Sequence, residues 1–140
     1  MKPFKFRLCI ALLVALCLPA VGQSKLLVVD VPFNFVAGGK SLPAGEYRVS
    51  RAFLWSDDGW SIRSSKNSAA IITNEVRSPH KAHRPSMVFV HTSDGYSLAQ
   101  IWTSEHVGHE LQLRPSVKTI ILTEEKKSNK SPQYVEIASK

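Results

Sequence analysis

Hydrophobic and polar residues alternate along much of the chain, most clearly over residues 25–36. Every second residue there is hydrophobic from Leu27 onward, whereas Asp30, Pro32 and Asn34 point the other way. A period of two places successive side chains on opposite faces, so this pattern predicts a half-buried strand. Because proline cannot donate a hydrogen bond to a strand ladder, Pro32 is expected at an edge, a bulge or a break.

Glycine, aspartate and asparagine divide the rest of the chain into further short hydrophobic segments. The segments predicted to be strands are 46–53, 60–62, 69–73, 86–91, 96–102 and 134–138. Two of the intervening turns, 57–59 and 93–95, contain Asp-Gly, which between hydrophobic runs is the strongest short-range signal for a hairpin. Residues 54–55 are therefore expected to pair with 60–62. Residues 103–108 lack such a pattern and are predicted to form a loop.

Residues 117–127 carry two conflicting signals. Val117, Ile120 and Ile121 have the spacing of one helical face, and Ser116 is suited to cap the helix N-terminus. Five of the first seven residues are β-branched, which favours a strand instead. We favour a short helix here.

Short strands joined by turns, without alternating helices, predict a mainly β fold. We expect an antiparallel β-sandwich or small barrel, with one short C-terminal helix. The missing strand-helix-strand alternation excludes a doubly wound nucleotide-binding sheet. Residues 23–140 are predicted to form a single β-rich domain.

The first 22 residues have the pattern of an export signal. Lys2, Lys5 and Arg7 precede an uncharged apolar run at 8–18, and the small residues Ala20 and Gly22 suit cleavage after Gly22. The apolar run is shorter than the roughly 20 residues that a membrane span needs. We therefore predict a signal peptide at 1–22 and an exported protein, either periplasmic or extracellular.

Removing this segment changes the composition. The whole chain has 140 residues and a net charge of +7; residues 23–140 are 118 residues with 15 basic and 11 acidic side chains, a net charge of +4. Cys9 and Cys17 both lie in the signal, so the mature chain has no disulfide and no cysteine nucleophile or thiolate metal site. No second apolar segment is long enough to span a membrane, and the modest charge without a recognition motif argues against a nucleic-acid partner.

Four stretches resemble segments of a known group of proteins. They are 31–35 (VPFNF), 42–47 (LPAGEY), the hydrophobic residues at 88–89 together with those at 98–102, and 108–111 (GHEL). In these the chain resembles a family of small exported bacterial β-rich proteins of unknown function. The resemblance implies an exported β-fold and no catalytic residue. In that family the segment after Gly-x-Glu-Leu is charged and helix-like, whereas here it is richer in β-branched residues.

The histidines offer the one arrangement that suggests a metal. His106 and His109 are three residues apart and are flanked by Glu105 and Glu110. On one helical turn such histidines can share a metal ion, and a carboxylate can complete its coordination. The alternative is a pair of solvated loop histidines. We predict no cofactor and no metal, and keep a metal-binding protein or metal-dependent hydrolase using His106 and His109 as the alternative function.

The proline-bounded loop at 77–85 is basic. It contains Arg77, Lys81 and Arg84, no acidic residue, and the histidines His80 and His83. Such a loop can meet phosphate, an acidic polymer or an anionic membrane surface. The alternative is an ordinary solvated loop.

Three tryptophans raise the second alternative function, binding of an acidic polymer or carbohydrate. Trp55 and Trp60 bracket the 57–59 turn and are expected to be cross-strand partners that pack the hairpin. Exposed, coplanar rings would instead form a platform for a sugar. Trp102 is expected to pack within the sheet.

No arrangement of side chains predicts catalysis. His91, Ser93 and Asp94 are too close in sequence for a triad, and no nucleophile elbow is present. The carboxylate pairs at 57–58 and 124–125 belong to a turn and to a charged run, not to two sides of a cleft. We therefore predict a non-catalytic binding or structural module of the cell envelope or exterior, whose partner is an envelope component or an acidic polymer.

Overall fold

A computed structural model describes residues 27–53, 55–128 and 132–140. The predicted signal peptide lies outside these residues. Within them, helix α2 is too short and too polar to cross a membrane.

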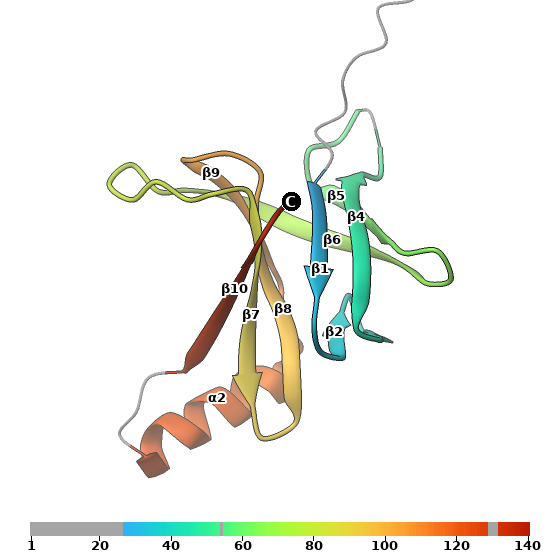
Figure 1. The fold of residues 1–140 in the computed structure, drawn as a ribbon. Coiled ribbons are helices and arrows are strands. Elements are labelled where there is room, and N and C mark those ends of the chain that lie inside the picture. Colours follow the sequence, from blue (N-terminus) through green and yellow to red (C-terminus); the bar gives the residue numbers. More distant parts are fainter. Residues whose placement is uncertain (1–26, 54, 129–131) are drawn as a thin grey trace, which may run out of the picture.

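The described chain is mainly β, with one helix near its C-terminus (Figure 1). The strands are β1 (Leu27–Val31), β2 (Phe35–Ala37), β3 (Lys40–Leu42), β4 (Gly45–Arg51), β5 (Gly59–Arg63), β6 (Ser68–Arg77), β7 (Ser86–Thr92), β8 (Gly95–Trp102), β9 (Val107–Leu111) and β10 (Gln133–Ala138). The helix is α2 (Pro115–Ser128). These elements confirm the predicted mainly β fold with a short C-terminal helix.

The strands form a mixed sheet in the order β1-β4-β5-β6-β9-β8-β2-β3, with β7 on the other edge of β8 and β10 beside β7. All neighbours are antiparallel except β2 and β8, which run parallel. Apart from this one pairing, the strands have the antiparallel arrangement that the sequence predicts. The described strands do not close into a barrel.

Strand β6 connects the two halves of the sheet. Its first half, residues 68–72, pairs with β5, and its second half, residues 73–77, pairs with β9. Figure 1 shows β1 and β4 on one side and β7, β8 and β10 on the other, and β1 contacts both β7 and β10. The core between these halves is built from alternate residues of the strands. Its largest fully buried side chains are Trp60, Tyr47, Phe35, Phe89, Leu42, Ile62, Met87, Leu98 and Ile101.

The alternating segment 25–36 divides at Pro32, one of the places expected for this residue. The residues before it form β1 and those after it form β2. Two glycines then turn the chain back into β3, with φ of 54° at Gly38 and 85° at Gly39. Positive φ at both central residues is what a tight hairpin of this kind requires. A Cβ at Gly38 would also lie 2.6 Å from the carbonyl oxygen of Ala70.

Two local predictions are wrong. Trp55 does not pair with 60–62, since β4 ends at Arg51, whose partner across the ladder is Trp60; Leu54 lies outside the described residues. The hairpin loop is therefore longer than the Asp-Gly signal suggested. Strand β9 begins at Val107, inside the segment 103–108 that the sequence predicts to be a loop. The prediction fails there because the burial of β9 depends on neighbours distant in sequence and not on a strong pattern of its own.

Candidate functional site

The structure does not bring His106 and His109 together. His109 lies in β9 and is buried, with its ring centroid 4.6 Å from that of Trp60. His106 precedes the strand and is exposed, with Nδ1 2.9 Å from the carbonyl oxygen of Ser78. Residues three apart in an extended chain point to opposite sides, whereas metal sharing required one helical turn. Among the described residues, no group of three or more His, Cys, Asp and Glu side chains is placed to hold a metal ion.

The basic loop is partly anchored to the sheet. The ring of His83 stacks on Trp102, with centroids 3.7 Å apart and planes 8° apart. Its Nδ1 lies 4.0 Å from a carboxylate oxygen of Glu136, which also accepts a 2.7 Å hydrogen bond from the Ser86 hydroxyl. His83 therefore covers the edge of the core, and the shallow cavity of about 310 Å³ beside it includes an acidic group.

The residues considered for catalysis serve the hairpins and the helix. The ring of His91 stacks on Tyr96, with centroids 4.4 Å apart. The backbone N–H of Ser93 donates a 2.8 Å hydrogen bond to Glu124, and Asp57 pairs with Arg51.

The three tryptophans have different environments. Trp60 and Trp102 are buried, whereas Trp55 is 85% exposed. The predicted cross-strand pair of Trp55 with Trp60 is therefore wrong. Trp60 points into the core, and its Nε1 donates to the carbonyl oxygen of Asp57 at 3.2 Å.

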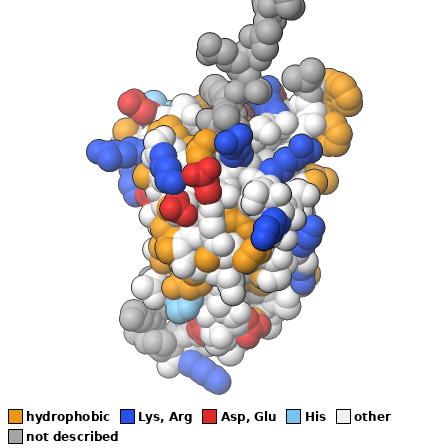
Figure 2. All heavy atoms as spheres, turned by 45° about the vertical axis from the view of Figure 1, so that its right-hand side comes forward, with side chains coloured by type: hydrophobic (Ala, Val, Ile, Leu, Met, Phe, Trp, Pro, Cys, Tyr) orange, Lys and Arg blue, Asp and Glu red, His pale blue; other side chains and the backbone are white. Residues whose placement is uncertain are grey.

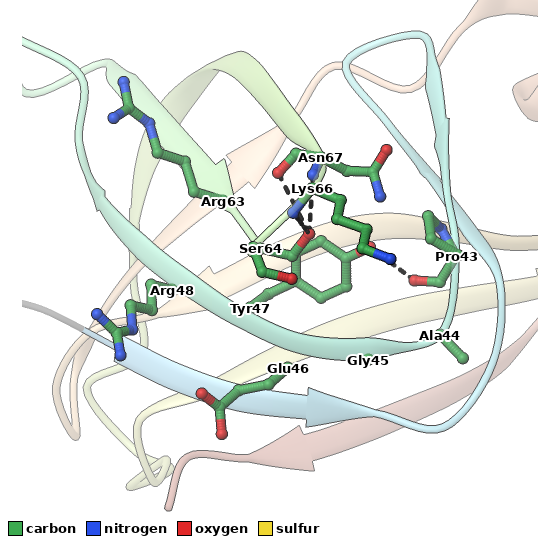
Figure 3. Close-up of a pocket in the computed structure, with 11 residues that line it drawn as sticks. Pro43, Ala44, Gly45, Glu46, Tyr47, Arg48, Arg63, Ser64, Lys66 and Asn67 are labelled. Carbon is green, nitrogen blue, oxygen red and sulfur yellow. Dashed lines mark hydrogen bonds between the residues drawn. The ribbon is translucent and has the colours of Figure 1, made fainter.

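A groove of about 750 Å³, which the sequence did not predict, lies between two turns (Figure 3). One wall is residues 43–48, where the chain enters β4, and the other is residues 63–67, where β5 turns into β6. Each turn is held locally. Asn34 Oδ1 accepts the N–H of Ala44 at 3.0 Å, and Ser64 Oγ accepts the N–H of Asn67 at 3.0 Å.

Tyr47 lies at the base of this groove. Its side chain is buried, and its hydroxyl donates a 2.6 Å hydrogen bond to the carbonyl oxygen of Pro43. Burial raises the pKa of Tyr47 above its usual value, and a hydrogen bond with Ser64 opposes this shift. The phenol is therefore protonated at neutral pH and acts as a fixed donor rather than as a nucleophile.

The cations at the groove have no acidic partner among the described residues. Arg48 and Arg63 are directly opposite each other on β4 and β5, and neither forms an ion pair there. Figure 3 shows both side chains extending away from the phenol, and Lys66 reaching across the groove above it. The lining carboxylate, Glu46, is already 3.0 Å from Nζ of Lys140.

This charge arrangement was not predictable from spacing alone. The alternating pattern of β4 places Arg48 on the outward face, but nothing in the sequence says that Arg63 is its partner. The sequence did show a different charge cluster, at 77–85. In the structure, His83 of that cluster packs onto the sheet.

Comparisons of this chain with known proteins leave its family undetermined. No family model, no curated protein and no solved structure matches the chain.

Proposed function

We propose that this chain is an exported, non-catalytic binding module of the cell envelope or exterior, and that its groove binds an acidic group of the partner. The observation that carries the proposal is the pair Arg48 and Arg63. Like charges directly opposite each other destabilise a sheet. An anion between them relieves that repulsion, so the pair suits binding better than it suits folding.

The chemistry of the groove fits a carboxylate, phosphate or sulfate. Guanidinium groups offer planar, paired donors that match such oxyanions, and Lys66, on the same wall as Arg63, adds a third positive charge. The phenol of Tyr47 is engaged with Pro43 and remains protonated, so it supplies no base. These features support binding rather than turnover.

Amide chemical shifts recorded while inorganic phosphate is added test this assignment. We expect the largest changes at residues 45–48 and 63–67, decreasing as sodium chloride is raised because salt screens the charges. In an R48Q/R63Q variant the affinity should fall about tenfold or more, since a hydrogen bond to a charged group is worth about 1.5–3 kcal/mol.

A variant with the same loss of charge elsewhere is the matched control. Lys118 and Lys126 are exposed on α2, so K118Q/K126Q should bind phosphate as the unmodified chain does. Equal weakening in the two double variants would mean that only net charge matters, and would refute the groove as the site.

Export has its own measurement. N-terminal sequencing of the protein recovered outside the cytoplasm of an expressing bacterium should begin at Gln23. A product that keeps residues 1–22 and stays with the cytoplasm would contradict the export part of the proposal.

A further inference from the structure

Two aromatic rings are exposed beside the groove-bearing strands. Phe53 is 51% and Trp55 85% exposed, and their rings stack with centroids 5.7 Å apart and planes 30° apart. Ile72 on β6 is 77% exposed. Single exposed apolar side chains are ordinary, but a cluster of large ones marks a site of interaction.

Gly59 brings these three side chains together. It is opposite Ile72 in the ladder of β5 and β6, so both positions face the same side of the sheet. A Cβ at Gly59 would lie 2.9 Å from a ring carbon of Phe53. The bare glycine therefore lets Phe53 lie across the outer face of the sheet, next to Ile72.

The same face leads from these rings to the arginine pair. Gly59 and Arg63 are four residues apart on β5, which corresponds to about 13 Å along a strand. The row between them consists of small side chains: Ser50, Ser61 and Ala70. We name this surface, from the arginines through the small residues to the aromatic cluster, the outer strip. Figure 2 shows hydrophobic side chains at the upper right of this side of the molecule and Lys and Arg side chains spread below them.

We propose that the outer strip binds an extended acidic oligosaccharide. Its carboxylates lie against Arg48 and Arg63, and a sugar ring stacks by its C–H face on the exposed indole of Trp55. The small residues between the two ends leave the strip low enough for intervening sugar units to lie flat, with a hydroxyl group beside that of Ser50, which is partly exposed. This inference rests on the proposed function, and it adds the class of ligand.

Charge and area favour a glycan over other occupants. Asp58 is exposed in the loop that carries Trp55 and forms no ion pair among the described residues. The same carboxylate can accept hydrogen bonds from sugar hydroxyls. The surface area of three apolar side chains is also far below the roughly 800 Å² per partner that a stable protein interface buries.

Calorimetric titration with a galacturonic acid hexasaccharide tests the inference. We expect it to bind more tightly than galacturonic acid itself, and more tightly than a neutral glucose hexasaccharide. W55A should weaken hexasaccharide binding about tenfold while leaving inorganic phosphate binding unchanged. Because Trp55 is so exposed, its removal should not unfold the protein.

The control is Y134A, which removes a ring that is 57% exposed on β10 and should leave both affinities unchanged. Unchanged hexasaccharide affinity in W55A, or binding of anionic phospholipid vesicles in place of the hexasaccharide, would overturn this inference but not the groove. Unchanged phosphate binding in R48Q/R63Q would instead refute the proposed function.

Discussion

At the scale of single residues, the packing of Trp102 explains a glycine of the Gly-x-Glu-Leu stretch. Gly108 is opposite Trp102 in the ladder of β8 and β9, and a Cβ at Gly108 would lie 2.8 Å from two atoms of the indole. His83 stacks on the same ring at 3.7 Å. The missing side chain is therefore what allows a buried indole to join the basic loop to the sheet.

We predict that G108A lowers the free energy of unfolding by about 1–3 kcal/mol, because the added methyl group overpacks this contact. Urea denaturation measures the change. With W102L as the background, the cost of G108A should shrink, because the ring that the methyl group meets is gone. Equal costs in both backgrounds would show that the glycine serves the backbone rather than the ring.

At the scale of elements, helix α2 resolves the ambiguity of residues 117–127. The hydroxyls of Thr119 and Thr123 donate to the carbonyls four residues earlier, at 2.9 and 2.8 Å. These bonds satisfy the hydroxyl groups of two of the five β-branched residues within the helix. The predicted short helix is confirmed.

The helix is also tied to the β7–β8 hairpin through Glu124, which accepts the N–H of Ser93. We predict that E124A accelerates hydrogen exchange of the Ser93 amide and lowers the free energy of unfolding by about 0.5–1.5 kcal/mol. E125A removes the neighbouring carboxylate as a control and should leave that amide unchanged. The same exchange rate in both variants would exclude this anchor.

At the scale of the whole molecule, the last two residues fasten the end of the chain, one to the residue that precedes β7 and the other to β1. The N–H of Ser139 donates to Pro85 at 2.8 Å, and the N–H of Lys140 donates to Val28 at 3.0 Å. Nζ of Lys140 also lies 3.0 Å from Glu46, which raises the pKa of this lysine. Because the pKa is raised, the ammonium group of Lys140 stays charged at neutral pH and the ion pair persists. The pair is lost only when the pH rises through the pKa of this lysine.

Deleting residues 139–140 should lower the free energy of unfolding by about 1–2 kcal/mol, since two backbone hydrogen bonds are lost. Urea denaturation measures the loss, and hydrogen exchange should quicken in β1. K140A keeps both backbone bonds and should have a smaller, salt-sensitive effect, because an exposed ion pair is weak. A deletion no more harmful than K140A would show that the C-terminal backbone does not fasten the end of the chain.

The sequence by itself determined most strands, the β7–β8 hairpin and the break at Pro32. These features follow from period-two burial and from the local conformational preferences of glycine, aspartate and proline. Local preference acts within a few residues, so it can be read without knowing what a segment packs against.

The tertiary structure decided the partners. β9 is a strand because Gly108 meets Trp102 and His109 meets Trp60, contacts that no local pattern specifies. The groove exists because the register of β4 on β5 sets Arg48 against Arg63, fifteen positions away in the chain. The register of a strand depends on the packing of its whole buried face. The groove that carries the proposed function therefore forms only when the sheet is assembled.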